Sequence, residues 1–178
     1  MIVSVFEATV RITREELELH RIEISEAYAP GTLDYHGADF RQAAPLKVDG
    51  VAELVDSEMR IRGHLETSLE LLCDRCLAPV VIPVEQDFDL FYRPVSSIAR
   101  EEEVELPEEE LDIGFYSADG IQLAEVLAEQ VILSVPMKVV CRVDCRGFCP
   151  DCGANLNVVK CGCQPRKGSS PFASLKEG

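Results

Sequence analysis

The chain has 178 residues, of which 47% are hydrophobic, enough for one well-filled core of ordinary domain size. Its formal net charge of −15 argues against a protein that grips nucleic acid or anionic lipid over most of its surface. No apolar run approaches the roughly 18 residues that span a bilayer, and residues 1–7 lack the cationic start of a signal peptide. We therefore expect a cytoplasmic protein without a membrane partner.

Charge is distributed unevenly along the chain. Residues 138–178 carry seven basic and three acidic side chains, a net charge of +4, which leaves −19 for residues 1–137. The same segment holds six of the eight cysteines. We therefore expect two parts, an acidic and mostly β domain at 1–137 and a basic, cysteine-rich tail at 138–178.

The N-terminal segment indicates mainly β structure. Apolar residues alternate with a period of two over residues 3–12, which is typical of a strand. Thr13 and Glu16 have the spacing of a capping box, which favours a helical turn after them. A turn is predicted at residues 30–31 and a loop over residues 34–44, because both are rich in turn-forming residues.

Three longer segments carry the clearest strand signal. They cover residues 46–54, 59–72 and 80–92. The breaks between them are short, and parallel strands need long crossovers, so an antiparallel meander is predicted.

A helix is predicted after a strongly acidic segment. Eight of the twelve residues at 101–112 are acidic, which is typical of a solvated loop and alternatively of a decoy for a basic partner. A strand is expected at 111–116 and an amphipathic helix at 122–133, which Pro136 ends. The fold class is therefore α+β, an antiparallel β meander or partly closed barrel with one main helix packed on it.

The cysteines of the tail indicate a metal site. Cys149-Pro-Asp-Cys152-Gly has the form of a zinc knuckle, in which two thiolates bind one ion and the glycine lets backbone N–H groups approach the sulfurs. Structural zinc takes four ligands, so two more are needed. All three histidines lie far upstream, which favours a site built from sulfur alone and holding about one Zn²⁺ per chain.

The spacing leaves two ligand sets open. One set is Cys141, Cys145, Cys149 and Cys152, and the other is Cys149, Cys152, Cys161 and Cys163. We favour a site drawn mostly from residues 141–152. Free thiols in the tail and an iron–sulfur cluster are the alternatives, because four cysteines also hold such clusters.

Cys73-Asp-Arg-Cys76 lies between two predicted strands. A metal-binding pair at a hairpin tip, either alone or with tail cysteines, is one interpretation, and a structural or contact-making pair without metal is another. A redox CxxC motif needs a helix after its first cysteine, whereas residues 77–82 indicate a strand. Arg75 could contact a phosphate or a carboxylate, and a solvated Arg75 is the default.

No catalytic constellation emerges from the sequence. There is no Walker loop, GxGxxG motif or nucleophile elbow, and the histidines form no pattern with a partner. We therefore expect a protein that is not an enzyme and has no small-molecule substrate.

Three motifs of the chain belong together. They are Cys73-Asp-Arg-Cys76-Leu77, the helix end at 129–137, and the run from Cys141 to Asn157 with the Cys161-Gly-Cys163 pair and the 171–175 terminus after it. In combination they resemble the YceD family of large ribosomal RNA subunit accumulation proteins. The resemblance implies a non-enzymatic factor that supports 23S rRNA accumulation and large-subunit biogenesis.

The charge pattern suggests how such a factor would make its contacts. An acidic body repels phosphate and suits a basic ribosomal protein, so RNA contact is expected in the tail. The candidate RNA contacts are Arg142, Arg146, Lys160, Arg166 and Lys167. We therefore expect an adaptor that binds rRNA, a large-subunit ribosomal protein, or both. The alternatives are a zinc-ribbon protein-interaction module without an RNA role and a thiol oxidoreductase that uses Cys73 and Cys76.

Overall fold

A computed structural model describes residues 10–97, 113–117 and 119–163. The chain divides into two compact units: unit 1 consists of Met1–Leu71 with Val80–Met137, and unit 2 of Leu72–Pro79 with Lys138–Gly178. The division after Met137 falls where the composition changes. The segment Leu72–Pro79, which lies within the first predicted part, groups with the tail.

In its described residues, unit 1 is mostly β sheet with two helices. Its elements in chain order are β1 (Arg11–Ile12), α1 (Arg14–Leu19), β2 (Ile22–Tyr28), β3 (Arg41–Gln42), β4 (Leu46–Val55), β5 (Glu58–Leu72), β6 (Pro79–Pro94), a 3₁₀ turn (Val95–Ser97), β7 (Ile113–Tyr116), β8 (Ile121–Gln122) and α2 (Leu123–Leu133). The strands predicted over 46–54, 59–72 and 80–92 correspond to β4, β5 and β6. The helix predicted over 122–133 is α2, and it ends at Leu133, three residues before Pro136.

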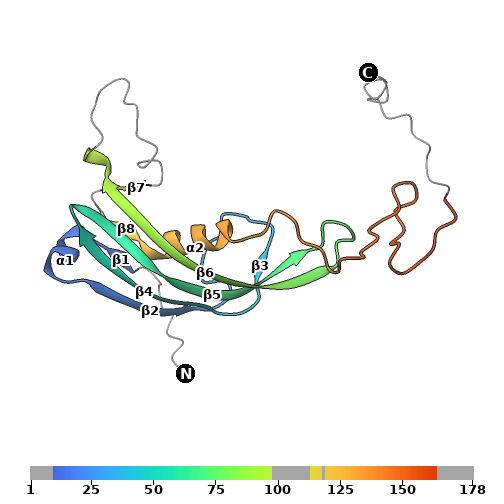
Figure 1. Cartoon of the computed structure of the whole chain (residues 1–178), viewed down its shortest axis with the longest axis horizontal. Coiled ribbons are helices and arrows are strands. Elements are labelled where there is room, and N and C mark those ends of the chain that lie inside the picture. The colour runs from blue at the N-terminus through green and yellow to red at the C-terminus, as the bar shows by residue number, and fades with distance from the viewer. Residues whose placement is uncertain (1–9, 98–112, 118, 164–178) are drawn as a thin grey trace, which may run out of the picture. The chain divides into compact units, whose positions relative to one another are not determined.

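The main sheet has six strands, in the order β2-β4-β5-β6-β7, with β3 paired to β5 (Figure 1). The strand pairs β2–β4 and β4–β5 are antiparallel, as the meander predicts. The prediction of an antiparallel sheet is wrong at β7, which pairs in parallel with β6. Two parallel neighbours run in the same direction, so the chain must turn back after β6 before β7 begins. The long connection between these two strands provides the length for this return.

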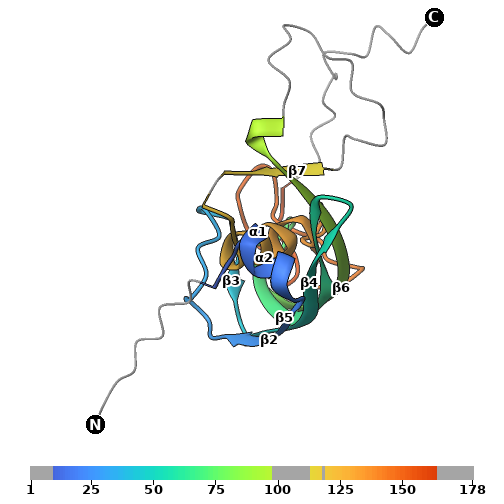
Figure 2. The ribbon, with the colours of Figure 1, turned by 90° about the vertical axis from the view of Figure 1, so that its left-hand side faces the viewer.

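The sheet curves but does not close into a barrel in the part of the chain that the structure describes. Figure 2 shows the strands bending around α2, which lies along the concave side. The helix buries one face, including the fully buried Leu123, Leu127 and Val131. These side chains and the buried residues of β4 and β5 form the core, among them Leu46, Ile61, Leu65 and Leu69.

Short elements outside the meander complete unit 1. Thr13 and Glu16 form the predicted capping box, and α1 follows it. The strand predicted over 3–12 appears in the described residues as β1, which pairs with β8 in a separate two-stranded sheet. Residues 34–44 are not wholly a loop, because β3 lies within them. The acidic segment at 101–112 lies outside the described residues.

Candidate metal centre

Cys73 and Cys76 lie in the turn that joins β5 to β6. The N–H of Cys73 donates to the carbonyl of Ala78 at 2.8 Å, and the N–H of Leu77 donates to the carbonyl of Cys73 at 2.9 Å. Leu77 has φ = 54°, in the left-handed region that favours glycine. The two hydrogen bonds fold the segment back on itself, so that both thiols belong to one tight turn.

The zinc-knuckle motif of the tail forms the same turn. The N–H of Cys149 donates to the carbonyl of Ala154 at 2.8 Å, and the N–H of Gly153 donates to the carbonyl of Cys149 at 2.9 Å. Gly153 has φ = 70°, at the position that Leu77 occupies in the first turn. The chain therefore has two chelating turns with the same backbone hydrogen bonds, only one of which has a glycine.

The first turn joins two tail cysteines in a cluster, which we call the first cluster. It consists of Cys73, Cys76, Cys141 and Cys145, whose sulfur atoms all lie within 4.8 Å of one another. The Sγ atoms of Cys73 and Cys145 are 3.9 Å apart, and those of Cys76 and Cys141 are 3.7 Å apart. Four sulfurs bonded tetrahedrally to one zinc at about 2.3 Å lie roughly 3.8 Å apart, so the spacing fits a single ion.

Hydrogen bonds hold the two segments of the first cluster together. The N–H of Asp74 donates to the carbonyl of Val139 at 2.9 Å, and the N–H of Val139 donates to Oδ2 of Asp74 at 2.6 Å. The guanidinium of Arg75 donates to the carbonyl of Cys145 at 2.8 Å. Gly147 leaves room for this approach, because a Cβ at its position would press against the carbonyl of Arg75.

The second cluster lies entirely in the tail. It consists of Cys149, Cys152, Cys161 and Cys163, whose sulfur atoms also lie within 4.8 Å of one another. Cys149 is buried, Cys161 is half-buried, and Cys152 and Cys163 are exposed. The sulfurs of this cluster therefore have more access to solvent than those of the first cluster, in which only Cys141 is exposed.

Asn157 forms hydrogen bonds with the chain segment that runs from Arg142 to Arg146. Its Oδ1 accepts from the N–H of Arg146 at 2.9 Å and from the guanidinium of Arg142 at 2.8 Å. Its side-chain amide donates to Sγ of Cys145 at 3.4 Å. One amide side chain thus fixes the backbone near Arg146 and also contacts a sulfur of the first cluster.

The protein environment favours thiolate at one cysteine of each turn. Burial raises the pKa of the Cys73 thiol, but N–H groups of Cys141, Arg75 and Cys76 outweigh it and lower the pKa to about 6. The N–H groups of Cys152 and Asp151 lower the pKa of Cys149 to about 7. Burial and the neighbouring Cys145 raise the pKa of Cys141 to about 12. A bound cation would stabilise all four thiolates of a cluster, because metal ligation requires deprotonated thiols.

The structure places the predicted ligands in a different combination from the favoured one. Cys141 and Cys145 group with Cys73 and Cys76, while Cys149 and Cys152 group with Cys161 and Cys163. The cysteines of residues 141–152 are thus split between two clusters. The second cluster is the alternative ligand set of the sequence analysis, and the first uses the pair in the β5–β6 turn.

The basic residues predicted to contact RNA have different surroundings. The guanidinium of Arg142 pairs with Asp144 at 3.3 Å in addition to its bond with Asn157. Arg146 and Lys160 are exposed. Arg166 and Lys167 lie outside the described residues. Arg75 is exposed, as expected by default, and its guanidinium also donates to the backbone carbonyls of Val143 and Cys145 in unit 2.

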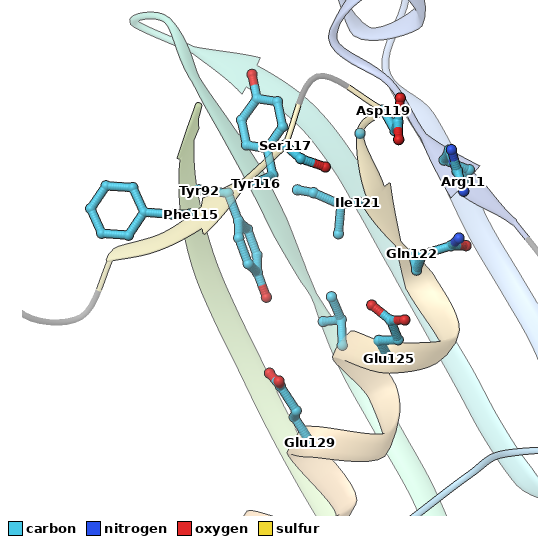
Figure 3. Close-up of a pocket in the computed structure, with 12 residues that line it drawn as sticks. Arg11, Tyr92, Phe115, Tyr116, Ser117, Asp119, Ile121, Gln122, Glu125 and Glu129 are labelled. Carbon is cyan, nitrogen blue, oxygen red and sulfur yellow. The ribbon is translucent and has the colours of Figure 1, made fainter. Parts of the chain in front are cut away.

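Unit 1 has a cleft of about 350 Å³ beside α2, which the sequence analysis did not predict. Figure 3 shows Glu125 and Glu129 on α2 facing Tyr92 of β6. Asp119 and Phe115 also line the cleft. Burial and the charge of Glu129 raise the pKa of Tyr92 to about 12. The cleft therefore combines three carboxylates and the guanidinium of Arg11 with the aromatic side chains of Tyr92 and Phe115, and its charged side chains are mainly acidic.

Among the described residues, no helix has the length and apolar character needed to span a membrane. By its architecture, this is a two-unit protein: one unit contains a curved β sheet, and the other contains two four-cysteine clusters.

The family model described as "Large ribosomal RNA subunit accumulation protein YceD" matches residues 61–177. The chain therefore belongs to the YceD family, as its motifs predict.

Curated relatives support this assignment. The chain is 29% identical over 175 residues to "Large ribosomal RNA subunit accumulation protein YCED homolog 1, chloroplastic" of Zea mays, covering 83% of this chain and 58% of the relative. It is 31% identical over 140 residues to an uncharacterized protein of Mycobacterium tuberculosis, covering 78% and 63% respectively. The chain thus spans about 58% to 63% of the length of these relatives. No solved structure matches the chain.

Proposed function

We propose that this protein is a non-enzymatic factor that supports the accumulation of 23S rRNA, and thereby biogenesis of the large ribosomal subunit in the cytoplasm. The observation that carries the proposal is membership of the YceD family. A relative that aligns with 83% of the chain is named for accumulation of the large ribosomal RNA subunit, which supports the same role here.

Zinc is the ion that the cysteine clusters would hold. Each cluster offers four sulfur donors, and thiolates favour zinc over hard cations such as magnesium. The Sγ–Sγ spacing of the first cluster suits one ion, whereas an iron–sulfur cluster divides its four cysteines among two or four iron atoms, so that not all four sulfurs lie this close together. The role of zinc would be structural, because all four ligands come from the protein and leave no open position.

The basic tail is the part that would contact RNA. It has a net charge of +4, and the exposed Arg146 and Lys160 lie beside the clusters that fix its backbone. Each phosphate contact releases counterions, so this binding would weaken as salt rises. Metal ligation would fix the backbone that carries Arg146 and Lys160, and so reduce the conformational entropy that the tail loses when it binds RNA.

The acidic body would contact a basic ribosomal protein. Residues 1–137 have a net charge of −19, which repels RNA and attracts a cationic protein. The cleft beside α2 would be one contact point, because Glu125 and Glu129 present carboxylates next to Tyr92. The protein would then act as an adaptor, with rRNA at the tail and a large-subunit protein at the body.

A protein-interaction module without an RNA role is the second candidate function. Large apolar side chains of unit 2 are exposed, notably Val143 at 93% and Val158 at 80%. Apolar side chains of this kind suit a protein partner better than a phosphate backbone. Crosslinking to RNA in growing cells would separate the two candidates, since only the first predicts crosslinks from the tail.

Complementation of a deletion strain tests the proposed function. Loss of the protein should lower mature 23S rRNA relative to 16S rRNA, and the unaltered gene should restore the ratio. A variant with Arg142, Arg146, Lys160, Arg166 and Lys167 each changed to Gln should fail to restore it. In vitro, the logarithm of the RNA-binding constant falls linearly with the logarithm of the salt concentration. Each lost contact should reduce the magnitude of this slope by roughly 0.7 on single-stranded RNA.

The matched control retains the charge at the same five positions. It exchanges each Arg for Lys and each Lys for Arg, and it should restore most of the ratio. Both variants must be folded and contain metal at the level of the unaltered chain. Full restoration by the Gln variant would show that the tail does not act through its charge, and a normal ratio in the deletion strain would contradict the proposed function itself.

A further inference from the structure

All eight cysteines of the chain belong to one of the two clusters. Each cluster contains one chelating turn, and the two turns have the same pair of backbone hydrogen bonds. Each turn is completed by two further cysteines, Cys141 and Cys145 in the first cluster and Cys161 and Cys163 in the second. Four thiolates complete one tetrahedral zinc site, so the eight cysteines are enough for two complete sites.

The two clusters connect the chain over very different distances. The first cluster joins residues that are 65 and 72 positions apart in the sequence. It links the β5–β6 turn to the tail, and the hydrogen bonds of Asp74 and Arg75 support the same link. The second cluster closes a loop within residues 149–163, so it depends on local chain folding alone.

Burial also differs between the clusters. Cys73, Cys76 and Cys145 are 0%, 5% and 4% exposed, whereas the second cluster has one buried cysteine and two exposed ones. A chelator removes a metal by bonding to it while protein ligands leave one at a time. Exposed ligands allow this exchange directly, whereas buried ligands require local opening of the chain first.

We propose that unit 2 binds two zinc ions, one in each cluster, and that the ion of the second cluster exchanges much faster than the ion of the first. The first ion then keeps the β5–β6 turn joined to the tail, and the second orders the loop at 149–163. This inference deepens the zinc part of the proposed function and does not depend on the role in rRNA accumulation.

Metal counting on the full chain tests the stoichiometry. Native mass spectrometry of protein prepared with zinc should show two ions per chain. Cys161→Ser with Cys163→Ser should leave one ion, and so should Cys73→Ser with Cys76→Ser. Val143→Ser is the matched control, because Val143 is exposed in the same unit but offers no ligand, and it should keep both ions. One ion in the unaltered chain would overturn the proposal.

A time course with excess EDTA tests the difference between the sites. The unaltered chain should lose zinc in two steps, with the first at least tenfold faster. The Cys161→Ser/Cys163→Ser variant should keep only the slow step, a result that does not depend on the folding of the first-cluster variant. Loss of both ions at one common rate, or a fast step that persists in this variant, would overturn the proposal. These measurements involve no RNA, so failure of the rRNA assay would be seen separately.

Discussion

Leu77 has an unusual combination of side chain, exposure and backbone conformation. It is a large apolar residue, it is 60% exposed, and its φ of 54° lies in the left-handed region. The equivalent residue of the other chelating turn is Gly153, which adopts this conformation without a steric cost. The sequence therefore places a strained residue where glycine would fit, and its exposure leaves little burial to compensate.

Replacing this leucine by glycine should stabilise the metal-binding turn. Leu77→Gly removes the Cβ clash of the left-handed conformation, which costs about 1 kcal/mol. The measurement is a titration with chelator. We expect the first cluster of the variant to lose half of its zinc at a higher chelator concentration than the first cluster of the unaltered chain. Leu77→Ala is the control, because it shortens the side chain but keeps the Cβ. Equal effects of the two substitutions would show that the backbone strain is not what matters.

His64 reports the electrostatics of the sheet surface. Its Nδ1 lies 2.7 Å from Oδ1 of Asp87, and hydrogen bonding to this carboxylate raises the pKa of the imidazole. The stability from this pair should be fully present below the unfolded pKa of about 6.5 and lost as the pH rises through the higher folded value. Asp87→Asn should lower the pKa of His64 in an NMR titration, and an unchanged midpoint would contradict this assignment.

At the scale of elements, the β4–β5 hairpin has the clearest local determinant. Val55 pairs with Glu58, so only Asp56 and Ser57 form the loop. Both have positive φ, at 49° and 90°, as a type I′ turn requires. Their twist matches that of the flanking strands, although neither residue is the glycine that this turn prefers.

Ser57→Gly should therefore stabilise unit 1 by about 1 kcal/mol, because it removes the cost of positive φ at the second loop position. The expected result is a higher midpoint in urea denaturation at an unchanged slope. Ser57→Ala removes the same hydroxyl but keeps a Cβ, and it should give no gain. A gain of equal size from alanine would point to the hydroxyl instead.

The sequence predicted the elements whose patterns are local. The strands β4, β5 and β6 have alternating apolar residues and clear breaks, and α2 has an apolar face and a terminating proline. The strand β2 was not predicted individually, although Ile22 and Ile24 alternate with polar residues. The parallel pairing of β7 could not be predicted, because a four-residue strand after a long connection carries no signal for its partner.

At the scale of the whole molecule, the division into two units has a physical basis. Unit 1 has an apolar core, whereas unit 2 is organised around cysteines and short hydrogen bonds. The sequence could predict a metal site in the tail from the knuckle motif and its neighbouring thiols. It left open whether Cys73 joins Cys145, because 72 residues separate them and only the fold brings them together.

Removal of the second cluster should leave the sheet intact. Cys149→Ser with Cys152→Ser takes away two ligands, and metal binding is coupled to folding in such sites. We expect faster amide exchange over residues 149–163, with unchanged protection in β4, β5 and β6. The zinc-loaded unaltered chain is the reference. Loss of protection in β4 and in the parts of β5 and β6 that belong to unit 1 would show that the two units do not fold separately.

Affinity purification of the full chain from growing cells, with the bound RNA and protein both identified, would test the proposed part in accumulation of the large-subunit rRNA. If the protein has this role, 23S rRNA should be enriched over 16S rRNA, together with at least one basic large-subunit protein. Recovery of 23S and 16S rRNA in the proportion found in a tag-only control, without a large-subunit protein, would rule the role out.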